Sequence, residues 1–125
     1  MEAPPVREPP YFDEVLDTWF LSVADYAGIT TDDLLTHCRV VVDPQGELIG
    51  VQISDEIPLD HILLQRGLKR ADIVKYINGV RVTTVSAARR TVREQYNSGV
   101  IKFEVKIERD GVEMVLRCIV PKPTK

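Results

Sequence analysis

The side chains best able to do nucleophilic, acid–base or metal chemistry in this chain are two histidines and two cysteines. His37 and Cys38 are adjacent, so a side chain that can act as a general base is next to one that can act as a nucleophile. Neighbouring side chains on a strand point to opposite faces, so His37 is poorly placed to activate Cys38. His61 lies in an unrelated context, where we expect a surface position on a short helix. The sequence therefore predicts no catalytic site.

Motifs for other chemistries are also missing from the sequence. It contains neither a Gly-x-Ser-x-Gly nucleophile elbow nor a glycine-rich phosphate loop. Two cysteines are too few for a disulfide framework or a four-thiolate zinc site. We expect Cys38 and Cys118 to be small buried hydrophobes, although a mutual disulfide stays open. The aspartates that are candidate calcium ligands in the first 43 residues, Asp13, Asp17, Asp32, Asp33 and Asp43, lack the spacing of a calcium loop. We expect no metal, no cofactor and no enzymatic activity.

Length and composition indicate one soluble globular domain. The 125 residues are enough for a single core, and 44% of them are hydrophobic and 28% charged. The apolar runs are far shorter than the roughly 20 residues of a membrane span. The 16 basic residues are scattered among 19 acidic ones, and the net charge is −3. This balance argues against nucleic-acid binding, which needs a one-sided excess of Lys and Arg. We also expect no membrane contact by this stretch of chain.

The first ten residues differ in composition from the rest. They contain four prolines and lack the basic region and apolar run of a signal peptide. We interpret residues 1–10 as a proline-rich linker, because each proline restricts its own backbone and that of the preceding residue. A chain that begins in a linker is compatible with a piece of a longer protein, so an upstream signal or anchor stays open.

Residues 11–37 are expected to form a helical extension. From Phe12 to Ala27 the apolar residues are spaced by three and four, which predicts one amphipathic helix that ends at Gly28. We favour packing of this helix on the domain's own core, because its acidic early turns do not suit an anionic membrane; a helix that binds a partner is the alternative. Thr30 and Asp33 resemble a capping box and predict a helical turn through Leu34, Leu35 and Thr36.

The remaining chain alternates between strand and helix patterns. Asn78-Gly79 is a dipeptide typical of tight hairpin turns, and Asp110-Gly111 marks another turn. The pattern predicts an α+β domain with a small, mainly antiparallel sheet whose openings are covered by helices. The expected strands are 39–43, 47–53, 73–77, 81–82, 100–109 and 112–120, and the expected helices are 59–66, begun by Pro58, and 85–96. Residues 121–125 are interpreted as a tail.

One stretch of this region resembles a known family. Gly67-Leu68, Asp72-Ile73 and Ile77-Asn78-Gly79 follow one another before a helix that carries Ala88. This order resembles the PDZ domain, and the resemblance covers about residues 39–120. It implies a partly open barrel capped by two helices over residues 38–120. Ala71 departs from the family, which usually has Gly before the Asp. We therefore expect an unstrained backbone conformation at Ala71.

The order of elements resembles the bacterial, permuted type of PDZ domain, because two long strands follow the second helix of the domain. Such modules occur in the inner-membrane clamp protein of type II secretion and in periplasmic PDZ proteases. The compact hairpin and the proline-rich start look most like the secretion clamp. The resemblance therefore implies a protein transport or protease assembly, with a periplasmic or cell-envelope location if the parent protein is of that kind.

The resemblance also implies a function, the binding of a protein or peptide segment. PDZ domains add an extended segment to an exposed strand, and pockets along the neighbouring helix select its side chains. Since the glycine-containing carboxylate loop of the family is missing before the strand, recognition of a free C-terminus stays open. The alternative function is a structural contact made by the N-terminal helix or a sheet edge, and the oligomeric state is left open. The implied peptide-binding residues are His37, Cys38, Arg39, Val40, Val41, Val42, Val85, Arg89 and Val92, with Val85 expected on an exposed face.

Overall fold

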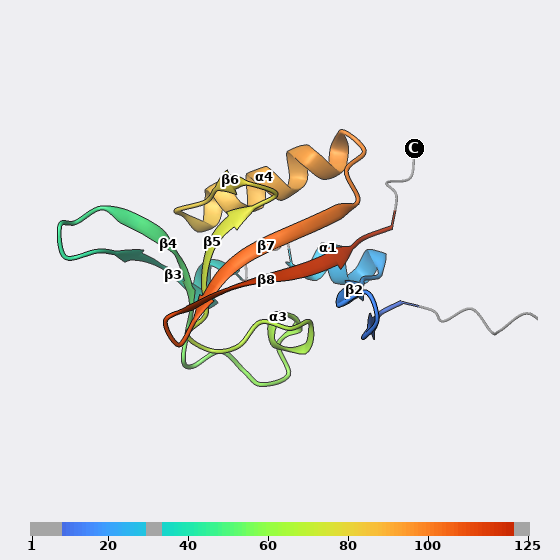
Figure 1. Cartoon of the computed structure of the whole chain (residues 1–125), viewed down its shortest axis with the longest axis horizontal. Helices are drawn as coiled ribbons and strands as arrows, with labels where there is room; N and C mark the ends of the chain where they lie inside the picture. The colour runs from blue at the N-terminus through green and yellow to red at the C-terminus, as the bar shows by residue number, and fades with distance from the viewer. Residues whose placement is uncertain (1–8, 30–33, 122–125) are drawn as a thin grey trace, which may run out of the picture.

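The fold is built on one mixed sheet, shown in Figure 1. The computed structural model describes residues 9–29 and 34–121. The strands are hydrogen-bonded in the order β1-β2-β8-β7-β5-β4-β3, and β6 pairs with β5 off this path. The strands are β1 (Tyr11–Asp13), β2 (Thr18–Phe20), β3 (Cys38–Val42), β4 (Leu48–Ile53), β5 (Ile73–Ile77), β6 (Val80–Arg81), β7 (Lys102–Arg109) and β8 (Val112–Ile119). The helices are α1 (Val23–Ile29), α2 (Leu34–His37), α3 (Ile62–Gln65) and α4 (Val85–Asn97).

The long hairpin of β7 and β8 shows why this region folds as predicted. Phe103 and Ile107 are buried on one face of β7, whereas Lys102 and Glu104 are exposed on the other. This alternation matches the period of two residues in a strand. The inward side chains join a core under α4, which lies above β5 and β7 in Figure 1. The α+β prediction and the hairpin turn at Asn78-Gly79 are confirmed, since both turn residues have positive φ.

The predicted helix from Phe12 to Ala27 is wrong. The first half of that segment is a β-hairpin, in which Phe12 lies opposite Trp19 and their rings are 5.5 Å apart. The turn is held by the Leu16 N–H, which donates to Asp13 Oδ1 at 3.0 Å, and by Asp17 at φ +51°. Aromatic side chains favour strands, and cross-strand aromatic pairs stabilise them. The helical spacing of the apolar residues was therefore overridden by this turn together with the pairing of β2 with β8.

Helix α1 begins later than predicted, at a cap that the sequence analysis missed. The Ser22 N–H donates to Asp25 Oδ2 at 3.0 Å, and the Asp25 N–H donates to Ser22 Oγ at 3.1 Å. This reciprocal pair is a capping box with Asp in place of Glu. Gly28 does not end the helix but lies inside it, where a Cβ would meet Ile62 at an ordinary contact distance of 3.5 Å. The capping box predicted at Thr30 and Asp33 lies outside the described residues, whereas the helical turn that follows it is confirmed as α2.

The N-terminal hairpin docks on the rest of the domain by extending its sheet. β2 pairs with β8 in parallel, with Trp19 beside Cys118, so the sheet is not wholly antiparallel. Arg66 lies 5.6 Å from the Trp19 ring and forms an ion pair with Asp25 at 3.0 Å. Burial alone would raise the pKa of Asp25, but hydrogen bonds from Arg66 and from the Ser22 N–H outweigh it and hold this pKa below its ordinary value. Docking of the extension was expected, but through a helix rather than a strand.

The short helix α3 is bounded differently from the prediction of 59–66. It begins at Ile62, and its N-cap is His61, whose Nδ1 accepts a hydrogen bond from the Leu63 N–H at 3.2 Å. His61 is therefore a half-buried capping residue and not simply a surface residue. Gly67 follows the helix at φ +105°, and a Cβ there would meet the Trp19 indole nitrogen at 3.1 Å. Glycine is needed at this position for both its backbone and its small size.

A buried ion pair fixes the loop between α3 and β5. Asp72 has a side chain that is 1% exposed and accepts two hydrogen bonds from Arg109, at 2.9 and 2.7 Å. It also accepts one from the Lys69 N–H at 2.7 Å, and Arg109 donates further to the Gly67 carbonyl. Asp72 is thus the hydrogen-bond acceptor of this turn. The pair ties the loop to the end of β7.

The expectation of an unstrained backbone at Ala71 is wrong. Ala71 has φ +70°, in the left-handed region that a Cβ disfavours. Its N–H donates to the Ile53 carbonyl at 2.9 Å, and this hydrogen bond holds the strained conformation in place. The loop therefore keeps the shape that glycine would adopt freely.

We expect Ala71→Gly to raise the free energy of unfolding by about 1 kcal/mol, because it removes this strain at an exposed site. Urea unfolding followed by circular dichroism measures the change. Ala87→Gly in α4 is the matched control and should lower stability by roughly the same amount, because glycine weakens a helix interior. A loss of stability in both variants would contradict the strain at Ala71.

Candidate functional site

Strand β3 forms one edge of the sheet. It pairs with β4, and no other strand among the described residues pairs with it. The hairpin of β3 and β4 projects from the body in Figure 1, and Val40 and Val42 are 43% and 53% exposed. An edge strand of this kind presents unpaired backbone N–H and C=O groups to an incoming chain. The predicted strand 39–42 is therefore an accessible edge, with Cys38 added at its start.

The two faces of β3 differ in character. Cys38, Val40 and Val42 share one face, because side chains alternate along a strand. Arg39 lies on the other face, where its guanidinium donates two hydrogen bonds to Gln52 Oε1 on β4, at 2.8 and 3.1 Å. A register shift between Val41 and Val42 bends the hairpin beyond this point. The face that carries Cys38 is thus apolar along the whole strand.

An apolar cavity of about 160 Å³ opens beside this face. Helix α4 lies next to β3, with Cα atoms of the two elements within 8 Å of each other. The structure brings Cys38, Val85, Arg89 and Val92 together at this cavity, as predicted. The other predicted residues lie beside it on β3 or before β3. The full lining is Leu21, Cys38, Val51, Ile53, Leu63, Arg66, Leu68, Val74, Ile77, Val85, Ala88, Arg89, Val92, Val105, Leu116, Arg117 and Cys118.

Val85 is not the exposed helix position that the sequence predicted. It is 8% exposed and belongs to a core cluster with Ile53 and Leu63. Thr84 caps α4 by accepting a hydrogen bond from the Ala87 N–H at 3.0 Å, and this cap places Val85 on the core side at the start of the helix. A charged residue at Val85 would therefore disturb folding.

The sequence analysis missed the inner wall of the cavity. Leu116 and Cys118 on β8 and Val105 on β7 reach it from the far side. The alternation of apolar and polar residues along β7 marks Val105 as an inward residue and was the signal that could have found it. β8 is apolar over 114–116 and 118–119, so its sequence does not show which of its side chains point inward. Leu21 follows the N-terminal hairpin, so its place at the cavity depended on the pairing of β2 with β8, which was not foreseen.

Neither cysteine forms a disulfide in this structure. Burial raises the pKa of the Cys118 thiol to about 11, so this sulfur is protonated at neutral pH and is a weak nucleophile. Both cysteines line the apolar cavity and contribute small hydrophobic side chains to it. Among the residues that the structure describes, no group of three or more His, Cys, Asp or Glu side chains could hold a metal ion.

His37 ends α2 directly before β3, where the resemblance places the ligand carboxylate. Its ring lies 5.0 Å from that of His61, edge to face, and its carbonyl accepts a hydrogen bond from the Ser54 N–H at 2.8 Å. The backbone directly before β3 is helical, because α2 covers residues 34–37.

Within the described residues, no helix is long and apolar enough to cross a membrane.

Comparisons with known proteins agree with this geometry at the level of fold. No protein-family model matches the sequence, and no curated protein matches it significantly. A solved PDZ domain of EpsC from Vibrio cholerae, residues 204–305, is 18% identical, with a TM-score of 0.50 over 77% of this chain and 91% of that one. The chain has the PDZ fold.

Two further solved PDZ domains are similar to this chain. A shorter EpsC fragment from Vibrio cholerae, residues 219–305, is 21% identical, with a TM-score of 0.44 over 66% of this chain and 93% of that one. The PDZ domain of HtrA3, solved with a phage-derived ligand (FGRWV), is 13% identical, with a TM-score of 0.40 over 63% of this chain and 82% of that one. In the PDZ fold of this chain β7 and β8 both follow α4, as predicted for the permuted arrangement.

Proposed function

We propose that this PDZ domain is a non-catalytic protein-interaction module that binds an extended polypeptide segment as an added strand on β3. The observation that carries the proposal is the open edge of β3 beside an apolar cavity and next to α4. A segment on this edge would lie within reach of α4, because the two elements are neighbours. The backbone groups of β3 would supply hydrogen bonds, and the cavity would select a side chain.

The size and lining of the cavity define the side chain that it selects. A volume of about 160 Å³ among aliphatic side chains suits one large apolar group. Val40 and Val42 continue this apolar face along β3 and would contact further side chains of the ligand. Since most hydrogen bonds would come from the ligand backbone, many sequences should bind, and micromolar affinity is expected.

The wider setting of the domain is part of the same proposal. Its sequence resemblance to bacterial PDZ modules favours a role in a secretion or protease assembly at the cell envelope. A structural contact is the second candidate function, now through the N-terminal hairpin rather than a helix. The observation in its favour is the tip of that hairpin, where Val15 and Leu16 are 94% and 56% exposed.

The proposed function can be tested with peptides selected from random libraries displayed with free and with blocked C-termini. We expect Val40→Lys to weaken binding of the recovered peptides by about tenfold or more, because it puts a charge on the apolar face of β3. Val80→Lys on β6 is the matched control, since Val80 is also a valine that is 44% exposed but lies off the groove. Fluorescence anisotropy of labelled peptides measures both.

If wild type and Val40→Lys are both folded and bind the peptides equally well, the groove is not the binding site. If peptides bind only with a free C-terminus, the C-terminal carboxylate of the ligand is recognised, and we would place it at the backbone near His37 and Cys38. Peptides that bind equally well when amidated would show recognition of an internal segment.

A further inference from the structure

The apolar cavity lies where two core clusters of the domain meet. Leu21 and Ile77 line it from one cluster, and Ile53 and Leu63 line it from the other. Leu68 packs against both clusters and lines the cavity as well. Protein interiors are otherwise close-packed, so an unfilled apolar space of about 160 Å³ costs stability. A ligand side chain that enters the cavity would contact both clusters at once.

Leu21 comes from outside residues 38–120, over which the sequence resembles the PDZ domain. It is 3% exposed, so its side chain faces the interior. Trp19 lies beside Cys118 in the parallel pairing of β2 with β8, and alternation along the chain places Leu21 on the same face as Trp19. Cys118 lines the cavity too. The N-terminal segment 11–29, which contains β1, β2 and α1, therefore supplies part of the cavity wall.

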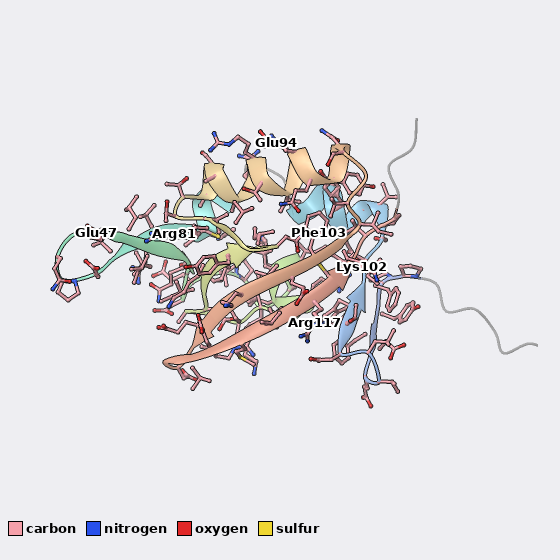
Figure 2. All side chains as sticks on the ribbon, turned by 45° about the horizontal axis from the view of Figure 1, so that its top comes forward. Glu47, Arg81, Glu94, Lys102, Phe103 and Arg117 are labelled. Atoms are coloured by element: carbon pink, nitrogen blue, oxygen red, sulfur yellow. The ribbon has the colours of Figure 1, made fainter. Side chains whose placement is uncertain are left out.

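Contacts on both sides of Leu21 hold this wall in place. Its own N–H donates to the Ile119 carbonyl of β8 at 2.8 Å. In α1, which follows, Asp25 accepts two hydrogen bonds from Arg66 at 3.0 and 3.2 Å, and Arg66 also lines the cavity. Figure 2 shows Arg117, another lining residue, on the part of β8 that lies beside the hairpin of β1 and β2. The wall is thus anchored to β8 and to the end of α3.

We propose that the N-terminal segment 11–29 is part of the peptide-binding site, and that Leu21 sets the size of the apolar side chain that the cavity accepts. This inference rests on the proposed function and adds a specificity-determining residue to it. An apolar cavity of about 150 Å³ holds benzene, so the cavity of this chain matches a phenyl ring or a branched aliphatic group, and Leu21 excludes an indole. The bound segment therefore carries Phe or Leu, rather than Trp, at the position that faces the cavity.

The test starts from the tightest peptide recovered from the random libraries, resynthesised with Val, Leu, Phe or Trp at the residue that alanine scanning identifies as its anchor. We expect wild type to bind the Phe peptide about tenfold more tightly than the Trp peptide. Leu21→Ala deepens the cavity and should make the Trp peptide bind at least as tightly as the Phe peptide. Leu21→Phe fills the cavity and should weaken the Phe peptide by about tenfold, with a much smaller effect on the Val peptide.

Ile107→Ala is the matched control, because Ile107 is 0% exposed, belongs to the same core cluster as Leu21 and lies outside the lining of the cavity. It should keep the wild-type ratio of Phe to Trp affinities, and an equal shift in this control would overturn the role of Leu21. Melting temperatures are compared first. If the two alanine variants do not fold, Leu21→Val and Ile107→Val each remove a single methylene, and the first alone should shift the ratio.

Benzene and indole test the cavity without any peptide. Nuclear magnetic resonance of the isotope-labelled chain follows the methyl groups of Leu21 and Leu116, which both line the cavity. Benzene should shift both residues in wild type. Indole should shift Leu116 in Leu21→Ala but not in wild type, because Leu21 leaves too little space for two fused rings.

The outcomes separate the role of Leu21 from the groove itself. If Leu21→Ala and Leu21→Phe fold and keep the wild-type ratio while Val40→Lys weakens every peptide, the groove stands and the role of Leu21 is overturned. A wild type that prefers the Trp peptide to the Phe peptide would overturn it as well. If no peptide binds the wild type, strand addition is overturned, and benzene shifts at Leu21 would then assign the cavity to a small apolar molecule.

Discussion

Asp72→Ala should lower the free energy of unfolding by about 3 kcal/mol, because it removes the buried partner of Arg109 and leaves that guanidinium, which is only 19% exposed, unpaired. Asp72 is 1% exposed and accepts three hydrogen bonds, two from Arg109 and one from the Lys69 N–H. Those hydrogen bonds to Asp72 raise the pKa of Arg109, and without them the guanidinium still stays charged, because arginine does not lose its proton near neutral pH. Native domains are stable by only about 5 to 15 kcal/mol, so a large part of the stability would be lost.

Urea unfolding followed by circular dichroism measures this loss. Glu108→Gln is the matched control, because Glu108 forms an ion pair with Lys75 at 2.9 Å in which both side chains are partly exposed. That pair should contribute about 1 kcal/mol or less. Similar losses in the two variants would show that the Asp72 pair is not buried as described.

The second large effect is expected at Trp19, which joins the N-terminal hairpin to the domain body. Its ring packs beside Phe12, Arg66 and the Cα of Gly67, and it contributes to the main core cluster. Trp19→Ala would leave a void between β2 and α3, and because the ring is half-buried we expect a loss of about 2 to 3 kcal/mol. Val15→Ala at the tip of the same hairpin is 94% exposed and should change stability by less than about 0.5 kcal/mol.

The fluorescence of the wild type gives an independent check, because Trp19 is the only tryptophan. Its emission should be blue-shifted relative to that of the unfolded chain. A fully solvated spectrum in the folded protein, or a Trp19→Ala variant as stable as wild type, would mean that the hairpin does not dock on the sheet.

The parts of the fold that could be predicted are those in which local and tertiary preferences agree. Along β7 the side chains alternate in polarity, β8 is a long apolar-rich run, and turn residues separate the two, so each strand was predicted to within a few residues. Helix α4 has a Thr84 cap and an apolar face that packs on the sheet. Cys38, Arg89 and Val92 could be assigned to the groove because the order of these elements resembles the PDZ domain.

The failures have a common physical cause, which is that local spacing does not reveal the partner of a segment. Phe12, Trp19 and Phe20 fit a helical stripe, but they form a hairpin because β8 offers an edge that β2 can join. Val85 was expected to be exposed because helical periodicity alone does not show how deeply one turn is packed. Ala71 was expected to be unstrained, although the hydrogen bond to the Ile53 carbonyl holds it at positive φ.

The central claim is that a polypeptide segment adds to β3 as a strand. The most direct test is nuclear magnetic resonance of the isotope-labelled chain in complex with a peptide recovered from the libraries. The account predicts intermolecular backbone contacts between the peptide and Cys38–Val42, slower hydrogen exchange of amides in β3, and shifts of Ala88 and Val92 on α4. Shifts confined to β1 and to the hairpin tip at Val15 and Leu16, with β3 unchanged, would contradict it and favour the structural contact instead.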